Sequence, residues 1–187
     1  TVEKDGKALL IEAGKILVSV GRKANLGQAG LDKLNVELLR NGVKVDEHMQ
    51  TSHPRVYACG DITCRSMLAH TAIRESEVAV NHILGVEDAM NYDCIPGVVY
   101  TNPEVAGVGK TEEELKALGT GYHIQKLPMA YSGRFVAENE LGNGLCKLVL
   151  DDGDRIIGCH LLGNPASEII VAAGIAVQHG YTEEELQ

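Results

Sequence analysis

Apolar and polar positions along the first half of the chain predict both strands and a helix. From residue 69 to 84, apolar side chains recur at helical spacing and Gly85 follows them, so we expect a helix over Ala69–Leu84. The continuous apolar run Lys15–Val20 predicts a strand buried on both faces of a parallel sheet. Val56–Ala58 predicts a shorter buried strand, and the pair Asp5-Gly6 predicts a hairpin turn. This half of the chain therefore indicates an α/β arrangement.

The pattern changes at residues 86–94. Beyond them, short apolar segments predict five strands, over Val98–Tyr100, Val105–Val108, Tyr122–Leu127, Cys146–Leu150 and Ile156–Leu162. One helix is expected over Thr111–Ala117, opened by a capping box of Thr111 and Glu114. A second helix should start at Asn164-Pro165 and end before Gly180. A sheet of short strands with separate helices indicates an α+β fold.

A third capping signature lies at the end of the chain, where Thr182 and Glu185 repeat the spacing of Thr111 and Glu114. It opens a helix only a few residues before Gln187, and one isolated helical turn is marginal. We therefore expect the natural protein to continue beyond this residue.

Composition excludes several classes of protein. The 187 residues include 17 basic and 26 acidic side chains, a net charge of −9, so no basic face is available for nucleic acid. Uncharged runs such as Ile156–Ser167 are too short and too polar to span a membrane. Five scattered cysteines without a C-x2-C pair argue against a secreted disulfide scaffold and a zinc site. We expect a cytoplasmic protein with no metal.

Cys59 and Cys64 have the C-x4-C spacing of some redox-active disulfides. Their context favours a structural role, because Val56–Gly60 is a strand that enters a turn and Cys59 occupies a variable position within it. We therefore do not assign a redox function to this pair.

The strongest candidate site is the turn that follows Val56–Ala58. Gly60 allows a backbone to approach a ligand without a Cβ in the way, and Asp61 offers an acceptor pair for sugar-like hydroxyls. A bare Gly-Asp pair would more often cap a helix. The whole segment Thr51–Asp61, a polar turn followed by a short buried strand, favours a dinucleotide site at the end of that strand.

Two further segments add candidate contacts. Met67, Leu68, Ala69 and His70 lie at the start of the expected 69–84 helix, whose free N–H groups and partial positive charge suit a group that gains negative charge. Gly21 follows the apolar run of Lys15–Val20, although an ordinary strand-end turn explains it equally well. His160 and His179 are more consistent with packing and helix-end roles than with catalysis.

Together these segments resemble the class I pyridine nucleotide–disulfide oxidoreductases, and most of all their dihydrolipoamide dehydrogenase branch. Thr51–Asp61 is similar to the second FAD fingerprint, which implies that Asp61 binds the flavin ribityl chain. Met67–His70 is similar to the stretch that lies against the isoalloxazine ring. Gly21-Arg22 resembles a junction beside the nicotinamide nucleotide, with Ala24 in place of the usual proline, and Ser76 replaces a usual glycine.

The resemblance implies a domain order. Residues 1–20 would end the NAD-binding domain, residues 21–88 would be the C-terminal part of the FAD-binding domain, and residues 89–187 would be a truncated interface domain. The expected fold is thus an α+β dimerisation domain, an antiparallel sheet of about five strands with flanking helices, preceded by a partial FAD-binding α/β segment. The segments 95–109 and 156–163 carry this part of the likeness.

The resemblance also implies a function for the parent enzyme, namely oxidation of dihydrolipoyl groups with NAD through a redox disulfide and FAD. Its partners would be a second copy, bound through residues 92–187, and lipoyl-bearing components of 2-oxo acid dehydrogenases or of glycine cleavage. The sequence contains no G-x-G-x-x-G, no redox cysteine pair and no His-Pro…Glu base, since His53-Pro54 belongs to the FAD-type turn. We expect no catalytic residue within these 187 residues, and an isolated chain that is inactive and binds FAD weakly or not at all.

Two alternatives remain open at this point. The chain could be a stand-alone, non-catalytic dimerisation module, although such a module has no reason to keep both the Thr51–Asp61 and the Met67–His70 segments. It could also belong to a related disulfide reductase that acts on mercuric ion, glutathione-like substrates or coenzyme A disulfide.

Overall fold

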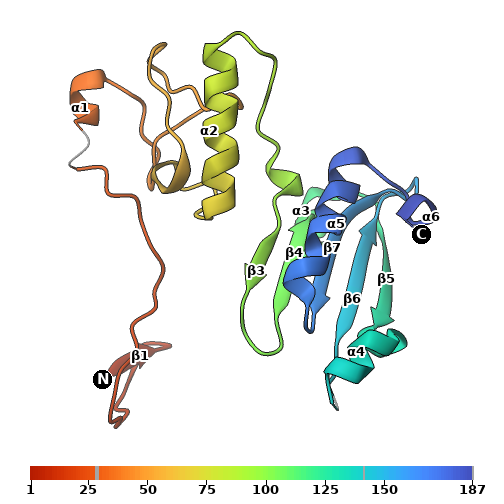
Figure 1. The fold of residues 1–187 in the computed structure, drawn as a ribbon. Coiled ribbons are helices and arrows are strands. Elements are labelled where there is room, and N and C mark those ends of the chain that lie inside the picture. Colours follow the sequence, from red (N-terminus) through yellow and green to blue (C-terminus); the bar gives the residue numbers. More distant parts are fainter. Residues whose placement is uncertain (28–29, 141, 187) are drawn as a thin grey trace.

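The computed structural model describes residues 1–27, 30–140 and 142–186, so Gln187, the end of the expected interface segment, lies outside the described residues. Figure 1 shows a five-stranded sheet at one side of the molecule and helix α2 with its surrounding loops at the other. The sheet has the order β3-β4-β7-β6-β5, and every neighbouring pair is antiparallel. Its strands are β3 (Gly97–Val99), β4 (Val105–Gly109), β5 (His123–Pro128), β6 (Leu145–Leu150) and β7 (Ile156–Leu162). The five predicted strands and the α+β class are confirmed.

Helix α5 (Ala166–His179) covers one face of this sheet (Figure 1). Ala106 and Val108 of β4 and Leu161 of β7 face Ile170 of the helix in one buried cluster. Complete burial of a side chain such as Ile170 stabilises the fold by roughly 2–3 kcal/mol relative to exposure. The helix ends at Gly180, whose φ of 65° is left-handed, as the sequence predicted.

The shorter helices of this part follow their local signals, with one exception. Helix α3 (Glu112–Leu118) has the predicted capping box, in which Thr111 and Glu114 bond reciprocally, and α6 (Glu183–Leu186) has the same arrangement between Thr182 and Glu185. The exception is α4 (Gly133–Glu138), preceded by the 3-10 turn η3 (Met129–Tyr131), which the sequence did not predict. Phe135 anchors α4 with only 4% of its surface exposed.

Helix α2 (Ala69–Ile83) confirms the helix predicted over Ala69–Leu84. Its buried face carries Val78 and Ala79, which pack on Met49 and Met90 from the loops on either side. Two 3-10 turns flank this region: η1 (Gly60–Thr63) lies against α2, and η2 (Tyr92–Cys94) leads into the sheet.

Residues 1–27 agree with the prediction only in part. The hairpin of β1 (Val2–Lys4) and β2 (Lys7–Leu9) is confirmed, with Asp5 and Gly6 both at positive φ. The strand predicted over Lys15–Val20 is wrong, since this segment has no strand partner among the described residues, and Leu17 and Val20 are each 90% exposed. A strand buried on both faces needs neighbours on both sides, and the described part of the chain provides none. The helix α1 (Leu31–Leu34) follows it.

The strand predicted over Val56–Ala58 is likewise reduced to a single bridge, between Tyr57 and Gln50. None of the helices that the structure describes is both long enough and apolar enough to cross a membrane.

An ion-paired clamp holds the segment that follows α2. Arg74 donates to both carboxylate oxygens of Asp88, and the Asn81 amide donates to one of them over 2.8 Å. These hydrogen bonds hold the pKa of Asp88 at about 2, below its ordinary value of 3.8. Because the folded state lowers this pKa, the clamp stabilises the protein fully above pH 4 and loses its effect as the pH falls towards 2.

We therefore expect Asp88→Asn to lower the free energy of unfolding by about 1 kcal/mol at pH 7, a value discounted for partial solvent screening. The difference between the two proteins should shrink as the pH falls from 4 to 2. Denaturant titrations at several pH values measure it, with the exposed neighbour substitution Glu87→Gln as the control. A constant difference across this pH range would contradict the assignment.

Candidate functional site

Hydrogen bonds close the loop that precedes the turn at Gly60 and Asp61. The backbone N–H and the hydroxyl of Thr51 both donate to the Val56 carbonyl over 2.9 Å, which closes the loop of residues 51–56. Gly60 then turns the chain with a left-handed φ of 79°, a conformation that favours glycine. Gly60 is buried and Asp61 is exposed, so the backbone of the turn is fixed and its carboxylate faces outward.

The start of α2 is open to a ligand. Its N-cap residue is Leu68, which has extended backbone angles and provides no side-chain cap for the first amides. Met67 and Leu68 are half-buried, whereas Ala69 and His70 are exposed. His70 has a partner that the sequence did not indicate, because its Nε2 lies 2.8 Å from the carbonyl oxygen of Pro96 just before β3. This contact joins the start of α2 to the five-stranded sheet.

Glu75 joins the turn to α2, and sequence reasoning missed it. The side chain is 0% exposed, its Oε2 accepts the Gly60 N–H over 2.5 Å, and its Oε1 accepts the Tyr92 hydroxyl over 2.6 Å. Burial and the adjacent Glu75 carboxylate raise the pKa of Tyr92, which keeps the phenol protonated as a donor. The only sequence signal was position: Glu75 lies one helical turn after Thr71 and one before Ala79, on the buried face.

Gly21 is not brought to this turn in the structure. It is exposed with φ 95°, and no heavy atom of the described residues beyond its chain neighbours lies within 4 Å of where its Cβ would be. Figure 1 shows residues 10–26 as an extended trace between the hairpin and α1. A role for Gly21 stays a prediction.

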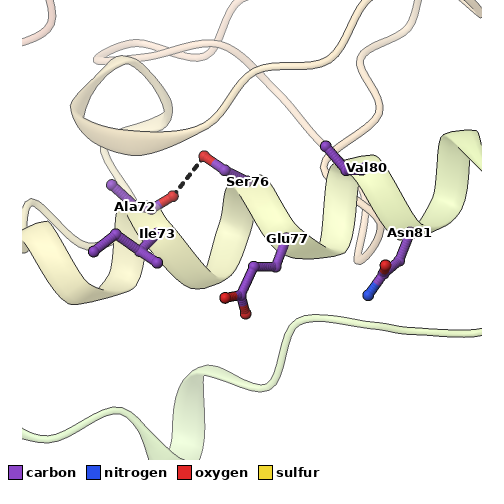
Figure 2. Close-up of a pocket in the computed structure, with 6 residues that line it drawn as sticks. All are labelled: Ala72, Ile73, Ser76, Glu77, Val80 and Asn81. Carbon is purple, nitrogen blue, oxygen red and sulfur yellow. Dashed lines mark hydrogen bonds between the residues drawn. The ribbon is translucent and has the colours of Figure 1, made fainter.

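An open groove of about 740 Å³ runs along the outer face of α2, shown in Figure 2. Ile73 and Val80 line it and are 63% and 53% exposed. The hydroxyl of Ser76 donates to the Ala72 carbonyl over 2.7 Å, so it is satisfied by its own helix. The groove is therefore a mainly apolar surface, and its other polar side chains are Glu77 and Asn81.

Two family models match the chain, on either side of the η2 linker. The one described as pyridine nucleotide-disulphide oxidoreductase matches residues 1–76, and the one described as the dimerisation domain of the same proteins matches residues 95–187. The chain belongs to the pyridine nucleotide-disulphide oxidoreductase family.

Relatives of this oxidoreductase chain include several dihydrolipoyl dehydrogenases. The mitochondrial protein of Caenorhabditis elegans is 40% identical over 185 residues, which are 98% of this chain and 37% of that protein. The Geobacillus stearothermophilus protein is 37% identical over 188 residues, 100% of this chain and 40% of that one. The chain thus spans only 37 to 40% of the length of these relatives.

Solved structures agree with this family. LpdA from Mycobacterium tuberculosis superposes with a TM-score of 0.80 at 27% identity, over 87% of this chain and 36% of that one. The flavoprotein disulfide reductase RclA from Escherichia coli gives a TM-score of 0.74 at 21% identity, over 88% of this chain and 38% of that one, a likeness of fold alone.

The residues of this oxidoreductase chain fit a flavin nucleotide in three respects. Asp61 presents an exposed carboxylate for hydroxyl groups, Gly60 supplies the left-handed turn, and the first amides of α2 have no side-chain cap. The two cysteines nearby are free thiols that do not form a disulfide, and the Cys64 thiol donates to the Asn41 carbonyl over 2.8 Å. This arrangement is consistent with a structural role for both.

The dimerisation domain of this family member exposes an apolar surface on α5. Val171 and Ile175, on the side of the helix away from the sheet, are 55% and 49% exposed, and Ile169 on the flank next to α4 is 42% exposed. Glu168 is the one acidic residue of the helix. A helix that is apolar on both sides is typical of a buried element, so this outer side fits an interface with another protein surface.

Proposed function

We propose that this chain supplies one side of the flavin site and the dimer interface of an FAD-dependent dihydrolipoyl dehydrogenase. The observation that carries the proposal is the exposed Asp61 carboxylate on a turn that is hydrogen-bonded to α2, a helix whose start has no side-chain cap. The 40% identity to dihydrolipoyl dehydrogenases over nearly the whole chain supports the same assignment.

In this proposal each residue of the site has a physical task. The Asp61 carboxylate accepts hydrogen bonds from the hydroxyls of the ribityl chain. Met67, Leu68, Ala69 and His70 face the isoalloxazine ring, where the helix start favours the negative charge that a reduced flavin carries. FAD, when bound, supplies electron transfer between a dithiol substrate and a nicotinamide nucleotide.

NAD is the proposed nicotinamide nucleotide, with Gly21 beside it, and lipoyl-bearing 2-oxo acid dehydrogenase or glycine cleavage components are the proposed partners. The proposed location is the cytoplasm. A homodimer through residues 92–187 is part of the same proposal, supported by the match to the family's dimerisation domain and by the apolar side of α5. A related disulfide reductase is the weaker alternative, because the likeness to such a protein is one of fold alone.

A chimera tests the flavin assignment. In it, these 187 residues replace the matching segment of the Geobacillus stearothermophilus dihydrolipoyl dehydrogenase, which supplies the remaining part of the enzyme. We expect a yellow protein that oxidises dihydrolipoamide with NAD. Asp61→Ala in the chimera should weaken FAD binding by about 100-fold, because it removes a charged acceptor of hydrogen bonds worth roughly 1.5–3 kcal/mol.

The matched control is Asp93→Ala, an exposed carboxylate on the η2 linker that forms an ion pair with Lys110. It should leave the FAD dissociation constant, measured by flavin fluorescence, within about twofold of that of the unsubstituted chimera. A chimera that folds and sediments as a dimer but carries no flavin would overturn the proposal.

A further inference from the structure

Glu75 is a buried carboxylate without a basic partner. It is 0% exposed, and no salt bridge within the described part of the chain includes it. Burying a carboxylate is costly unless hydrogen bonds satisfy its oxygens, and an apolar side chain would fill the same space at less cost. A position on the buried face of α2, between Thr71 and Ala79, therefore needs a reason beyond packing.

The first reason is the turn that carries Asp61. Glu75 accepts the Gly60 N–H, and the Thr63 hydroxyl donates to the Gly60 carbonyl over 3.0 Å. Both polar groups of the Gly60 backbone are thus held by buried side chains, since Thr63 is only 2% exposed. The next residue is Asp61, so these two bonds set the direction in which its carboxylate leaves the turn.

The second reason is the linker to the five-stranded sheet. The other oxygen of Glu75 accepts the hydroxyl of Tyr92, in the η2 turn just before β3. The Arg65 guanidinium lies 4.6 Å from the centre of the Tyr92 ring and so covers it. Arg65 belongs to the segment between Asp61 and Met67. Glu75 therefore holds the start of this segment through Gly60 and contacts its later part through Tyr92 and Arg65.

We propose that Glu75 is a positioning residue that fixes the Gly60–Asp61 turn relative to the start of α2 and ties both to the linker of the dimerisation domain through Tyr92. The inference rests on the proposed flavin function, because the turn it positions is the one assigned to FAD. Glu75 itself touches neither the cofactor nor the substrate in this proposal, and it acts only through Gly60 and Tyr92.

The first test needs no flavin. In the 187-residue chain, hydrogen exchange of the Gly60 amide should be at least tenfold faster in Glu75→Leu, which keeps the bulk and removes both acceptors. Glu75→Gln keeps one acceptor and should restore most of the protection. Glu77→Leu, two residues away with a side chain that is 60% exposed, is the matched control and should leave Gly60 unchanged.

The second test measures FAD affinity in the chimera. Glu75→Leu should raise the FAD dissociation constant at least tenfold, Glu75→Gln by less, and Tyr92→Phe, which loses only the linker bond, by about threefold. If Glu75→Leu fails to fold, Glu75→Gln and Tyr92→Phe still decide, because a solely structural role would change their melting temperature and leave both Gly60 exchange and FAD affinity unchanged.

The two proposals fail in different ways. An unsubstituted chimera without flavin overturns the proposed function, and with it the flavin part of this inference. A chimera that binds FAD equally well with Glu75→Leu, or a Gly60 amide whose exchange does not respond to Glu75→Leu, overturns the positioning role alone.

Discussion

Gly109→Ala should destabilise the five-stranded sheet by about 3–4 kcal/mol, a large part of the 5–15 kcal/mol that holds a typical domain together. Gly109 ends β4 with φ 76°, a left-handed conformation that costs other residues about 1–2 kcal/mol. A Cβ at this position would lie 2.3 Å from the Ile157 carbonyl oxygen and 2.7 Å from the Cα of Gly158. Both are backbone atoms, so relief requires β4 and β7 to move apart, at a further cost of roughly 1–3 kcal/mol.

The close approach has a structural purpose. Gly109 pairs with Gly158 across β4 and β7, and immediately afterwards the Lys110 N–H donates to the Ile157 carbonyl over 2.8 Å. The chain then leaves the sheet and enters the capping box at Thr111. A residue with a Cβ at position 109 would therefore disturb both the strand pair and the start of α3.

Thermal unfolding followed by circular dichroism measures the loss of stability in Gly109→Ala. The melting temperature of this variant should fall by about 10 °C. Gly133→Ala is the control, because it begins α4, has no positive φ, and no heavy atom beyond its neighbours lies within 4 Å of its Cβ position. It should leave the melting temperature unchanged or slightly raised. An equal loss in both variants would remove the backbone clash as the cause.

The sheet could be predicted because its signals are local. Each of the five strands is a short apolar segment bounded by turn residues, and the turn of residues 151–154 connects β6 and β7. The capping boxes at Thr111 and Thr182 involve residues three apart, so their partners are visible in the sequence itself.

The features that were missed depend on partners far away along the chain. Lys15–Val20 has the composition of a central strand, yet a strand is defined by its neighbours, and the described residues include none for it. Glu75 bonds to Gly60, 15 residues earlier, and to Tyr92, 17 residues later, and no local pattern shows either bond. Helix α4 was missed because its six residues are too few for a helical period.

The features of the candidate site likewise fall into those that the sequence predicted and those that only the fold shows. Gly60, Asp61 and the residues of Met67–His70 were found from their order along the chain, and they lie on η1, on the segment after it and at the start of α2. The bonds that fix them relative to one another, from Glu75 and from His70 to Pro96, appear only in the fold. Sequence patterns thus predicted which residues would face a ligand, and the structure adds those that hold them in place.

Ile175→Glu should convert the protein from a dimer to a monomer in the micromolar range. Ile175 lies on the outer side of α5 with Val171, and about half of its surface, 49%, is exposed in the single chain. A twofold interface presents the same patch on both subunits, so one substitution introduces two carboxylates. Desolvating each costs more than the roughly 1.4 kcal/mol that equals a tenfold change in affinity, so the dimer dissociation constant should rise at least about 100-fold.

Leu118→Glu is the matched control for this dimer test. Leu118 is 69% exposed at the end of α3. Glu112 of that helix accepts a hydrogen bond from Lys147 of β6. Side chains alternate along a strand, so Lys147 points to the face opposite Cys146 and Leu148, which pack in the cluster under α5. The substitution therefore places the same charge on the opposite side of the sheet and should leave the dimer intact.

Sedimentation velocity distinguishes the two variants, while far-ultraviolet circular dichroism checks that both remain folded. If the unsubstituted chain sediments as a monomer up to tens of micromolar, or if both variants dissociate equally, the outer side of α5 is not the interface.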